Sequence, residues 1–223
     1  MSVARLSERV RRDLTYRSYP ARDWTIPRRH DGARVLDVLI VGGGQGGLAT
    51  AFGLKLERIT NIRIVDRNPR GREGPWRRFA RMKELRTPKE VWGIDFGIPS
   101  LTAHAWYEAR FGRQAWERID RISPQAWRDY LDWYRDVLEL PVENEVEVIS
   151  IEPAGDYLRA QLRRKRRTWL DPVDFGVERA QISMILNRRI SRERRDRQNH
   201  QRERNRGRNP ERPGARCPHF GRQ

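Results

Sequence analysis

Six consecutive residues, Gly42-Gly43-Gly44-Gln45-Gly46-Gly47, satisfy the pattern G-x-G-x-x-G. A glycine-rich turn of this kind lets the backbone approach a pyrophosphate, because no side chain intervenes. An acidic residue, Asp66, follows 19 residues after Gly47. At about this spacing a carboxylate can accept hydrogen bonds from the ribose hydroxyls of a dinucleotide. The two features together predict a site for the ADP half of a dinucleotide.

Each position of the turn has a separate expected role. Gly42 lets the chain turn sharply out of a strand, Gly44 gives the pyrophosphate access to the backbone, and Gly47 lets helix and strand pack closely. The helix that follows the turn offers its N-terminal N–H groups and its positive dipole end to the phosphates, and Gln45 and Gly46 of the turn are counted among the cofactor-binding residues. A tight turn without any ligand is the alternative interpretation.

The elements around the turn support the ligand interpretation. Residues 35–41 are an almost continuous apolar run, typical of a strand buried on both faces of a parallel sheet. Residues 48–58 have apolar residues at helical spacing, and residues 62–65 form a second short strand that ends at Asp66. The acid disfavours a 2′-phosphate and hence NADP, although the neighbouring Arg67 weakens that argument.

The rest of the first 162 residues predicts a helical insert and a hairpin. Residues 67–100 are rich in proline and glycine and read as a long loop. Helices are expected over 102–111 and from Ser123, an N-cap followed by Pro124, to just before Pro141. Residues 145–151 and 157–162 alternate in polarity around a turn, which indicates a β-hairpin.

These motifs resemble flavin-containing monooxygenases and their bacterial relatives over about residues 35–162. In that family the first glycine motif binds FAD, and a Gly-x-Trp element beside the flavin follows the acidic residue. Trp76 matches this tryptophan, and residues 87–89 match a segment near the flavin ring. Val148 matches a hairpin position whose backbone contacts adenine. The resemblance implies FAD as the cofactor and NADPH as the reductant, with Arg67 counted among the cofactor-binding residues.

After the hairpin the family pattern is expected to stop. The family continues with a strand ending in Ala-Thr-Gly, a second G-x-G-x-x-G for NADPH and a closing Gly-Asp-like motif, and none is recognised here. We therefore expect a truncated or frame-shifted member with an incomplete FAD-binding domain and little activity alone. A genuine basic extension is the alternative.

The charge of the chain is concentrated at its C-terminal end. Residues 163–223 hold 19 Lys+Arg and 7 Asp+Glu, a net of +12 out of a formal +17 for all 223 residues. Apolar residues are scarce from 191 onward, so we expect residues 163–223 to be a disordered basic tail, with a helical fragment at most over 182–186. The predicted fold is α/β: an N-terminal arm (1–34), a Rossmann-like core with helical insert and hairpin (35–162), and this tail.

Other function classes have less support. The tail suggests non-specific polyanion or nucleic-acid binding, and the glycine turn alone would also fit an NAD-dependent dehydrogenase. The single cysteine, Cys217, excludes an internal disulfide, and the four histidines lack metal-ligand spacing. No apolar run could span a membrane and no secretory signal is evident, so a cytoplasmic protein is expected. No side chain stands out as catalytic, and the small-molecule substrate is not indicated.

Overall fold

A computed structural model describes residues 1–17, 22–30, 32–77, 79–164 and 177–186. Met1–Leu186 form one compact unit. The greater part of the arginine-rich tail, from residue 187 on, lies outside the described residues, and with it the predicted disorder and polyanion binding. No helix among the described residues is long and apolar enough to cross a membrane.

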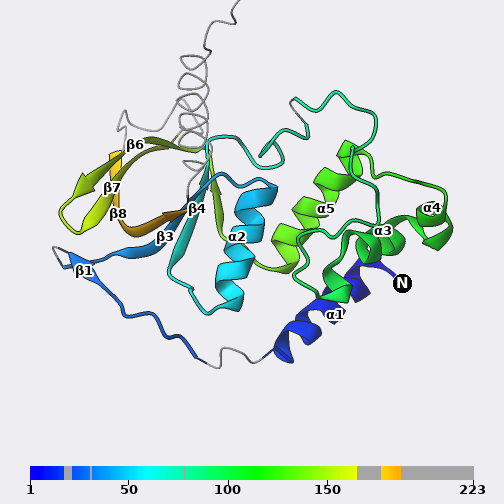
Figure 1. Cartoon of the computed structure of the whole chain (residues 1–223), viewed down its shortest axis with the longest axis horizontal. Coiled ribbons are helices and arrows are strands. Elements are labelled where there is room, and N and C mark those ends of the chain that lie inside the picture. The colour runs from blue at the N-terminus through cyan, green and yellow to red at the C-terminus, as the bar shows by residue number, and fades with distance from the viewer. Residues whose placement is uncertain (18–21, 31, 78, 165–176, 187–223) are drawn as a thin grey trace, which may run out of the picture. The chain divides into compact units, whose positions relative to one another are not determined.

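The centre of the unit is a six-stranded sheet with the strand order β5-β4-β3-β8-β7-β6 (Figure 1). Strands β5, β4, β3 and β8 run parallel, whereas β8, β7 and β6 pair antiparallel. The strands are β3 (Leu36–Val41), β4 (Ile62–Asp66), β5 (Val142–Asn144), β6 (Val146–Ala154), β7 (Tyr157–Arg164) and β8 (Val177–Leu186). A separate small hairpin joins β1 (Arg29–His30) to β2 (Ala33–Arg34).

The βαβ unit predicted from the sequence is confirmed. Strand β3 leads into α2 (Gln45–Leu56), and β4 pairs in parallel with β3. Both faces of β3 are covered, which explains its continuous apolar sequence. Val38 and Ile40 pack in the cluster that contains Leu48 and Phe52 of α2, while Leu39 packs in the cluster on the other face.

The helical insert lies between β4 and β5. It consists of a 3₁₀ turn, η1 (Pro99–Leu101), and the helices α3 (Ala103–Phe111), α4 (Arg113–Glu117) and α5 (Pro124–Val137). As expected, Ser123 caps α5, because its side chain accepts a hydrogen bond from the Ala126 N–H. The N-terminal arm contains helix α1 (Val3–Thr15), which contacts α3 and α5 (Figure 1).

Two buried tyrosines fasten α5 to the segment that precedes α3. The Tyr134 hydroxyl donates to the Ile94 carbonyl at 2.7 Å, and the Tyr130 hydroxyl donates to the Leu101 carbonyl at 2.9 Å. Burial raises the pKa of both hydroxyls. The aromatic side chains of the insert therefore act mainly as core, and Trp106, Trp116 and Trp127 are buried there.

The hairpin is confirmed as β6 and β7, but two expectations about the following residues are wrong. Arg163 and Arg164 are the end of β7, so the sheet continues beyond the expected domain boundary at residue 162. Residues 182–186 belong to strand β8, not to a helical fragment, and β8 pairs with both β3 and β7. A strand does therefore follow the hairpin, although it lacks the Ala-Thr-Gly ending of the family.

Candidate dinucleotide-binding site

The glycine turn connects the end of β3 to the start of α2. Gly42 has a φ of +110°, a conformation that glycine adopts without steric cost, and its N–H donates to the Val65 carbonyl at 2.8 Å. A Cβ atom at Gly47 would lie 1.8 Å from the Gly42 carbonyl oxygen. Any side chain at position 47 would therefore separate the helix from the turn, as the sequence predicted.

The N-terminus of α2 is open to a ligand. Gly44 is its N-cap and supplies no side-chain hydrogen bond to the first N–H groups of the helix. A Cβ at Gly46 would meet no atom of the described residues within 4 Å. The helix thus presents unpaired donors and its positive dipole end beside free space, the physical requirement for binding a phosphate.

A Cβ at Gly44, by contrast, would lie only 3.3 Å from the Cα of Gly74. Gly44 is the position at which the sequence predicted pyrophosphate access. In the structure its lack of a side chain also permits close contact between two backbone segments, the glycine turn and the loop after β4.

Asp66 ends β4 beside this turn and is only 6% exposed. Its Oδ2 accepts a hydrogen bond from the Gly43 N–H at 2.8 Å. Its Oδ1 accepts two from Asn68, from the backbone N–H at 2.7 Å and from Nδ2 at 3.0 Å. An ionised carboxylate has about four acceptor positions, so about one of them is left for a ribose hydroxyl.

Trp76 is linked to the glycine turn through a second tryptophan. Its ring meets Trp127 of α5 edge-on, with centroids 6.5 Å apart, and the Trp127 Nε1 donates to Gln45 Oε1 at 3.1 Å. The Trp76 Nε1 is buried and has no hydrogen-bond partner among the described residues. Trp76 also lines an open cleft of about 710 Å³. The other lining residues are Arg72, Arg77, Met82, Lys83, Ser123, Pro124 and Gln125.

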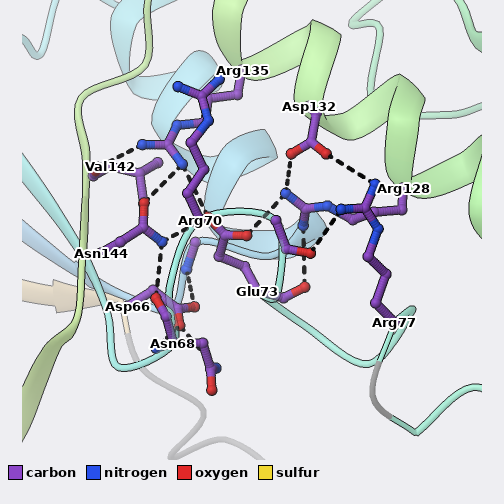
Figure 2. A network of polar contacts seen from close by, with 12 residues as sticks. Asp66, Asn68, Arg70, Glu73, Arg77, Arg128, Asp132, Arg135, Val142 and Asn144 are labelled. Atoms are coloured by element: carbon purple, nitrogen blue, oxygen red, sulfur yellow. Dashed lines mark hydrogen bonds and ion pairs between the residues drawn. The ribbon is translucent and has the colours of Figure 1, made fainter.

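A buried polar network surrounds Glu73 (Figure 2). The Glu73 carboxylate contacts Arg128 Nη2 at 2.9 Å and Arg135 Nη1 at 3.0 Å, and it accepts a hydrogen bond from Asn144 Nδ2 at 2.7 Å. Burial lowers the pKa of Arg135, and the charge of Glu73 partly offsets this shift. Asn144 Nδ2 also donates to the Asn68 carbonyl at 3.0 Å.

The structure brings together most of the site residues predicted from the sequence. Arg67 directly follows Asp66 and is exposed. Val148 is in β6, next to a register irregularity, on a strand that contacts β4. In the 87–89 segment, Lys89 Nζ donates to the Trp116 and Ile119 carbonyls and so fastens the end of α4.

Sequence reasoning missed Asn68, Asn144 and the buried role of Glu73. A local signal existed for Asn68, because an Asp side chain commonly accepts a hydrogen bond from the N–H two residues later. The role of Asn144 depends on the pairing of β5 with β4 and had no local signal. Among the described residues, no group of three His, Cys, Asp or Glu side chains could hold a metal ion.

Residues 39–204 match the model of a protein family described as FAD-NAD(P)-binding. The chain belongs to this family. The family predicted from the resemblance over about residues 35–162, and FAD as its cofactor, are thereby confirmed. The match runs beyond Leu162, where the sequence analysis expected the family pattern to stop.

Among curated proteins, the chain is 46% identical over 153 residues to an FAD-dependent urate hydroxylase of Xanthomonas campestris. The aligned part is 69% of this chain and 32% of the hydroxylase. The chain therefore spans about a third of the length of this curated relative.

Solved structures support the fold. An ornithine hydroxylase (PvdA) of Pseudomonas aeruginosa superposes with a TM-score of 0.54 at 15% identity, covering 68% of this chain and 38% of the other. A cadaverine monooxygenase (DfoA) of Erwinia amylovora, solved with FAD bound, gives 0.50 at 12% identity, covering 68% and 35%. At these identities the likeness concerns the fold alone.

Proposed function

We propose that this chain is the FAD-binding part of a flavin-dependent hydroxylase. The observation that carries the proposal is the uncapped N-terminus of α2, which lies beside free space at Gly46 and next to the carboxylate of Asp66. The family match and the 46% identity to an FAD-dependent urate hydroxylase support the choice of cofactor and reaction class.

The described residues fit the ADP half of FAD. The N–H groups at the start of α2 suit the pyrophosphate, and the remaining acceptor position of Asp66 suits one ribose hydroxyl. Because both Asp66 oxygens are already held, its carboxylate does not need to reorder when the ribose arrives. Val148 remains our candidate for the adenine contact.

The cleft beside Trp76 suits the flavin half. It combines a tryptophan ring with three cationic side chains, Arg72, Arg77 and Lys83. Arg77 is already paired with Asp129 at 2.8 Å, so Arg72 and Lys83 contribute most of the positive potential. When bound, the flavin supplies the redox chemistry of the family, whereas the protein binds and orients it and limits its contact with water.

Binding of FAD tests the proposal directly. We expect purified protein to bind FAD more tightly than NAD in a titration followed by flavin fluorescence and by calorimetry. Gly46→Leu should abolish binding without disturbing the turn, because its side chain enters free space that the proposal assigns to the pyrophosphate. Gly44→Leu is a poorer test, since it would collide with Gly74 even without a ligand.

Thr50→Leu is the matched control, because position 50 lies one helical turn further along the same face of α2. This variant should bind FAD with the affinity of the parent chain. If Gly46→Leu also bound normally, or if the parent chain preferred NAD, the proposed cofactor site would be wrong. A hydroxylation substrate is to be sought among compounds related to urate, following the relative's activity.

A further inference from the structure

Glu73 is a buried acid that the proposed function does not use. Its side chain is 0% exposed. The side chains of its partners Arg128 and Arg135 are 1% and 11% exposed. Arg128 is also paired with Asp132, which lies 3.7 Å from Arg77 Nη2 as well, so cations and carboxylates alternate through the network (Figure 2). Removing one charge from such a group leaves an uncompensated buried charge, which is strongly unfavourable.

Both ends of Glu73 are fixed to helix α5. The side chain forms the two ion pairs, and the backbone carbonyl accepts a hydrogen bond from Arg128 Nη1 at 3.1 Å. The Arg128 Nη2 contact with Glu73 Oε2 is an ion pair without hydrogen-bond geometry. The directional contacts are therefore those of Arg135 and Asn144 to Oε1.

The position of Glu73 in the chain gives this anchoring a consequence. Glu73 directly precedes Gly74 in the chain. A Cβ added at Gly44 would lie 3.3 Å from the Cα of Gly74. The Cγ of Glu73 itself lies 3.4 Å from the place of a Cβ at Gly43. The loop from Glu73 to Trp76 thus rests directly on the glycine turn, and a small displacement of one would displace the other.

The same network reaches the proposed ribose acceptor. Asn144 donates to Glu73 Oε1 and to the Asn68 carbonyl, and Asn68 donates to Asp66 Oδ1. A continuous set of hydrogen bonds therefore connects Asp66 at the end of β4 with Glu73 beside the loop of Trp76 (Figure 2).

We propose that Glu73 is a positioning residue for FAD, which holds the 73–76 loop against the glycine turn by means of Arg128, Arg135 and Asn144. The inference rests on the proposed function. It assigns to this buried ion-pair network a role in cofactor affinity in addition to a role in folding.

The test compares FAD affinity with the unfolding temperature of the cofactor-free protein in single and double variants. Glu73→Gln keeps the size of the side chain and removes its charge. We expect it to weaken FAD binding by about tenfold, the range produced by loss of a charge-assisted hydrogen bond, and to lower the unfolding temperature. Asp136→Asn is the matched control, because Asp136 lies on the same helix and its pair with Arg70 of the loop after β4 is exposed, so this variant should change neither quantity.

The double variant Glu73→Gln/Arg135→Gln separates positioning from folding. It removes the unbalanced charge, so the unfolding temperature should recover toward that of the parent chain. FAD affinity should stay low, because the anchor of the loop is still missing. Recovery of both quantities together would show that Glu73 acts only on folding and would overturn the inference.

Two further outcomes are decisive. If the parent chain binds FAD and folded Glu73→Gln binds it equally well, the inference fails while the proposed function stands. If the parent chain binds no FAD, both fail. Should Glu73→Gln not fold, Asn144→Ala decides, since it keeps both ion pairs of Glu73: affinity reduced about threefold or more supports the inference, and unchanged affinity overturns it.

Discussion

Gly46 and Gly47 are neighbours in the turn between β3 and α2, yet a methyl group has room at only one of them. At Gly47 an added Cβ would overlap the Gly42 carbonyl, whereas at Gly46 it would meet nothing. Glycine is therefore required by the fold at position 47. At position 46 it is required, on our proposal, by the ligand.

This difference predicts opposite behaviour for two alanine substitutions. Gly47→Ala should lower the free energy of unfolding by about 3 kcal/mol, the upper range for overpacking, and should lose FAD binding as a result. Gly46→Ala should leave stability unchanged or raise it by up to about 1 kcal/mol, because alanine is the better helix former. Its FAD affinity should nevertheless fall.

Chemical denaturation of the two cofactor-free variants, followed by FAD titration, measures both quantities. A Gly46→Ala protein with parental FAD affinity would argue against pyrophosphate contact at this residue. Equal stability of the two variants would contradict the geometry of the turn itself.

At this scale the sequence predicted residue types better than it predicted their partners. The glycines and Asp66 belong to a local pattern with a known spacing. The two oxygens of Asp66, however, are held by Gly43 and Asn68, and only Asn68 is close in sequence. The role of Glu73 was not recognised, because its arginine partners lie on α5, more than fifty residues away along the chain.

Among the secondary-structure elements, β8 contributes most to the completeness of the sheet. It lies between β3 and β7 and pairs with both. Its residues were not recognised as a strand, for two physical reasons. The neighbouring sequence is dominated by arginine, and Ile182, Ile185 and Leu186 also fit the spacing of a helical face. The alternation of Ala180, Ile182 and Met184 with the polar residues Gln181 and Ser183 was the available strand signal.

Two shortened chains test the role of β8. Ending the chain after Leu162 removes β8 and should reduce the unfolding temperature sharply or leave the protein aggregated, because β3 and β7 each lose a partner. Ending it after Leu186 removes none of the described strands and should leave the unfolding temperature close to that of the full chain. Thermal unfolding followed by circular dichroism compares them, and equal behaviour of the two would show that β8 is not part of the stable sheet.

The pairing of β4 with β5 includes an ion pair that responds to acid. Arg63 Nε lies 2.6 Å from Glu143 Oε1. Hydrogen bonding to Arg63 lowers the pKa of Glu143 from its ordinary value of 4.5, against the opposing effect of burial and with further help from Arg164. Because the pKa is lower in the folded state, the stabilisation is complete above about 4.5 and disappears as the pH falls through the folded value.

Glu143→Gln should therefore flatten the loss of stability on acidification while lowering stability at neutral pH. The measurement is the urea midpoint of both proteins between about pH 7 and about pH 3. The partly exposed position of Glu143 keeps the expected difference small. Parallel curves for the two proteins would contradict the assignment.

For the whole molecule, we expect FAD binding without catalytic oxidation of NADPH. The 223 residues contain one G-x-G-x-x-G, and on our proposal FAD occupies it. Hydride transfer from NADPH needs the nicotinamide in contact with the flavin, and a misplacement of about 1 Å can cost about 100-fold in rate. We therefore expect this chain to bind FAD without accelerating NADPH oxidation beyond that of free FAD.

The loss of NADPH absorbance, with FAD and with or without protein, measures this rate. A saturable oxidation that a substrate stimulates would mean that the chain holds a second nucleotide site of another kind. The arginine-rich residues 163–223 would then be the first region to search, given their net charge of +12.

The strand order also affects when the sheet can form during protein synthesis. On the ribosome β3 through β7 emerge before β8, yet Leu36 of β3 has its neighbour at Ile182. Domains generally fold as units during synthesis, so the sheet cannot be completed before β8 has been made. Until translation has passed Leu186, the open side of β3 is accessible to a chaperone, to the hairpin in a wrong register, or to another nascent chain. The time that translation takes from the hairpin to Leu186 thus sets how long the open side of β3 is exposed to misassembly.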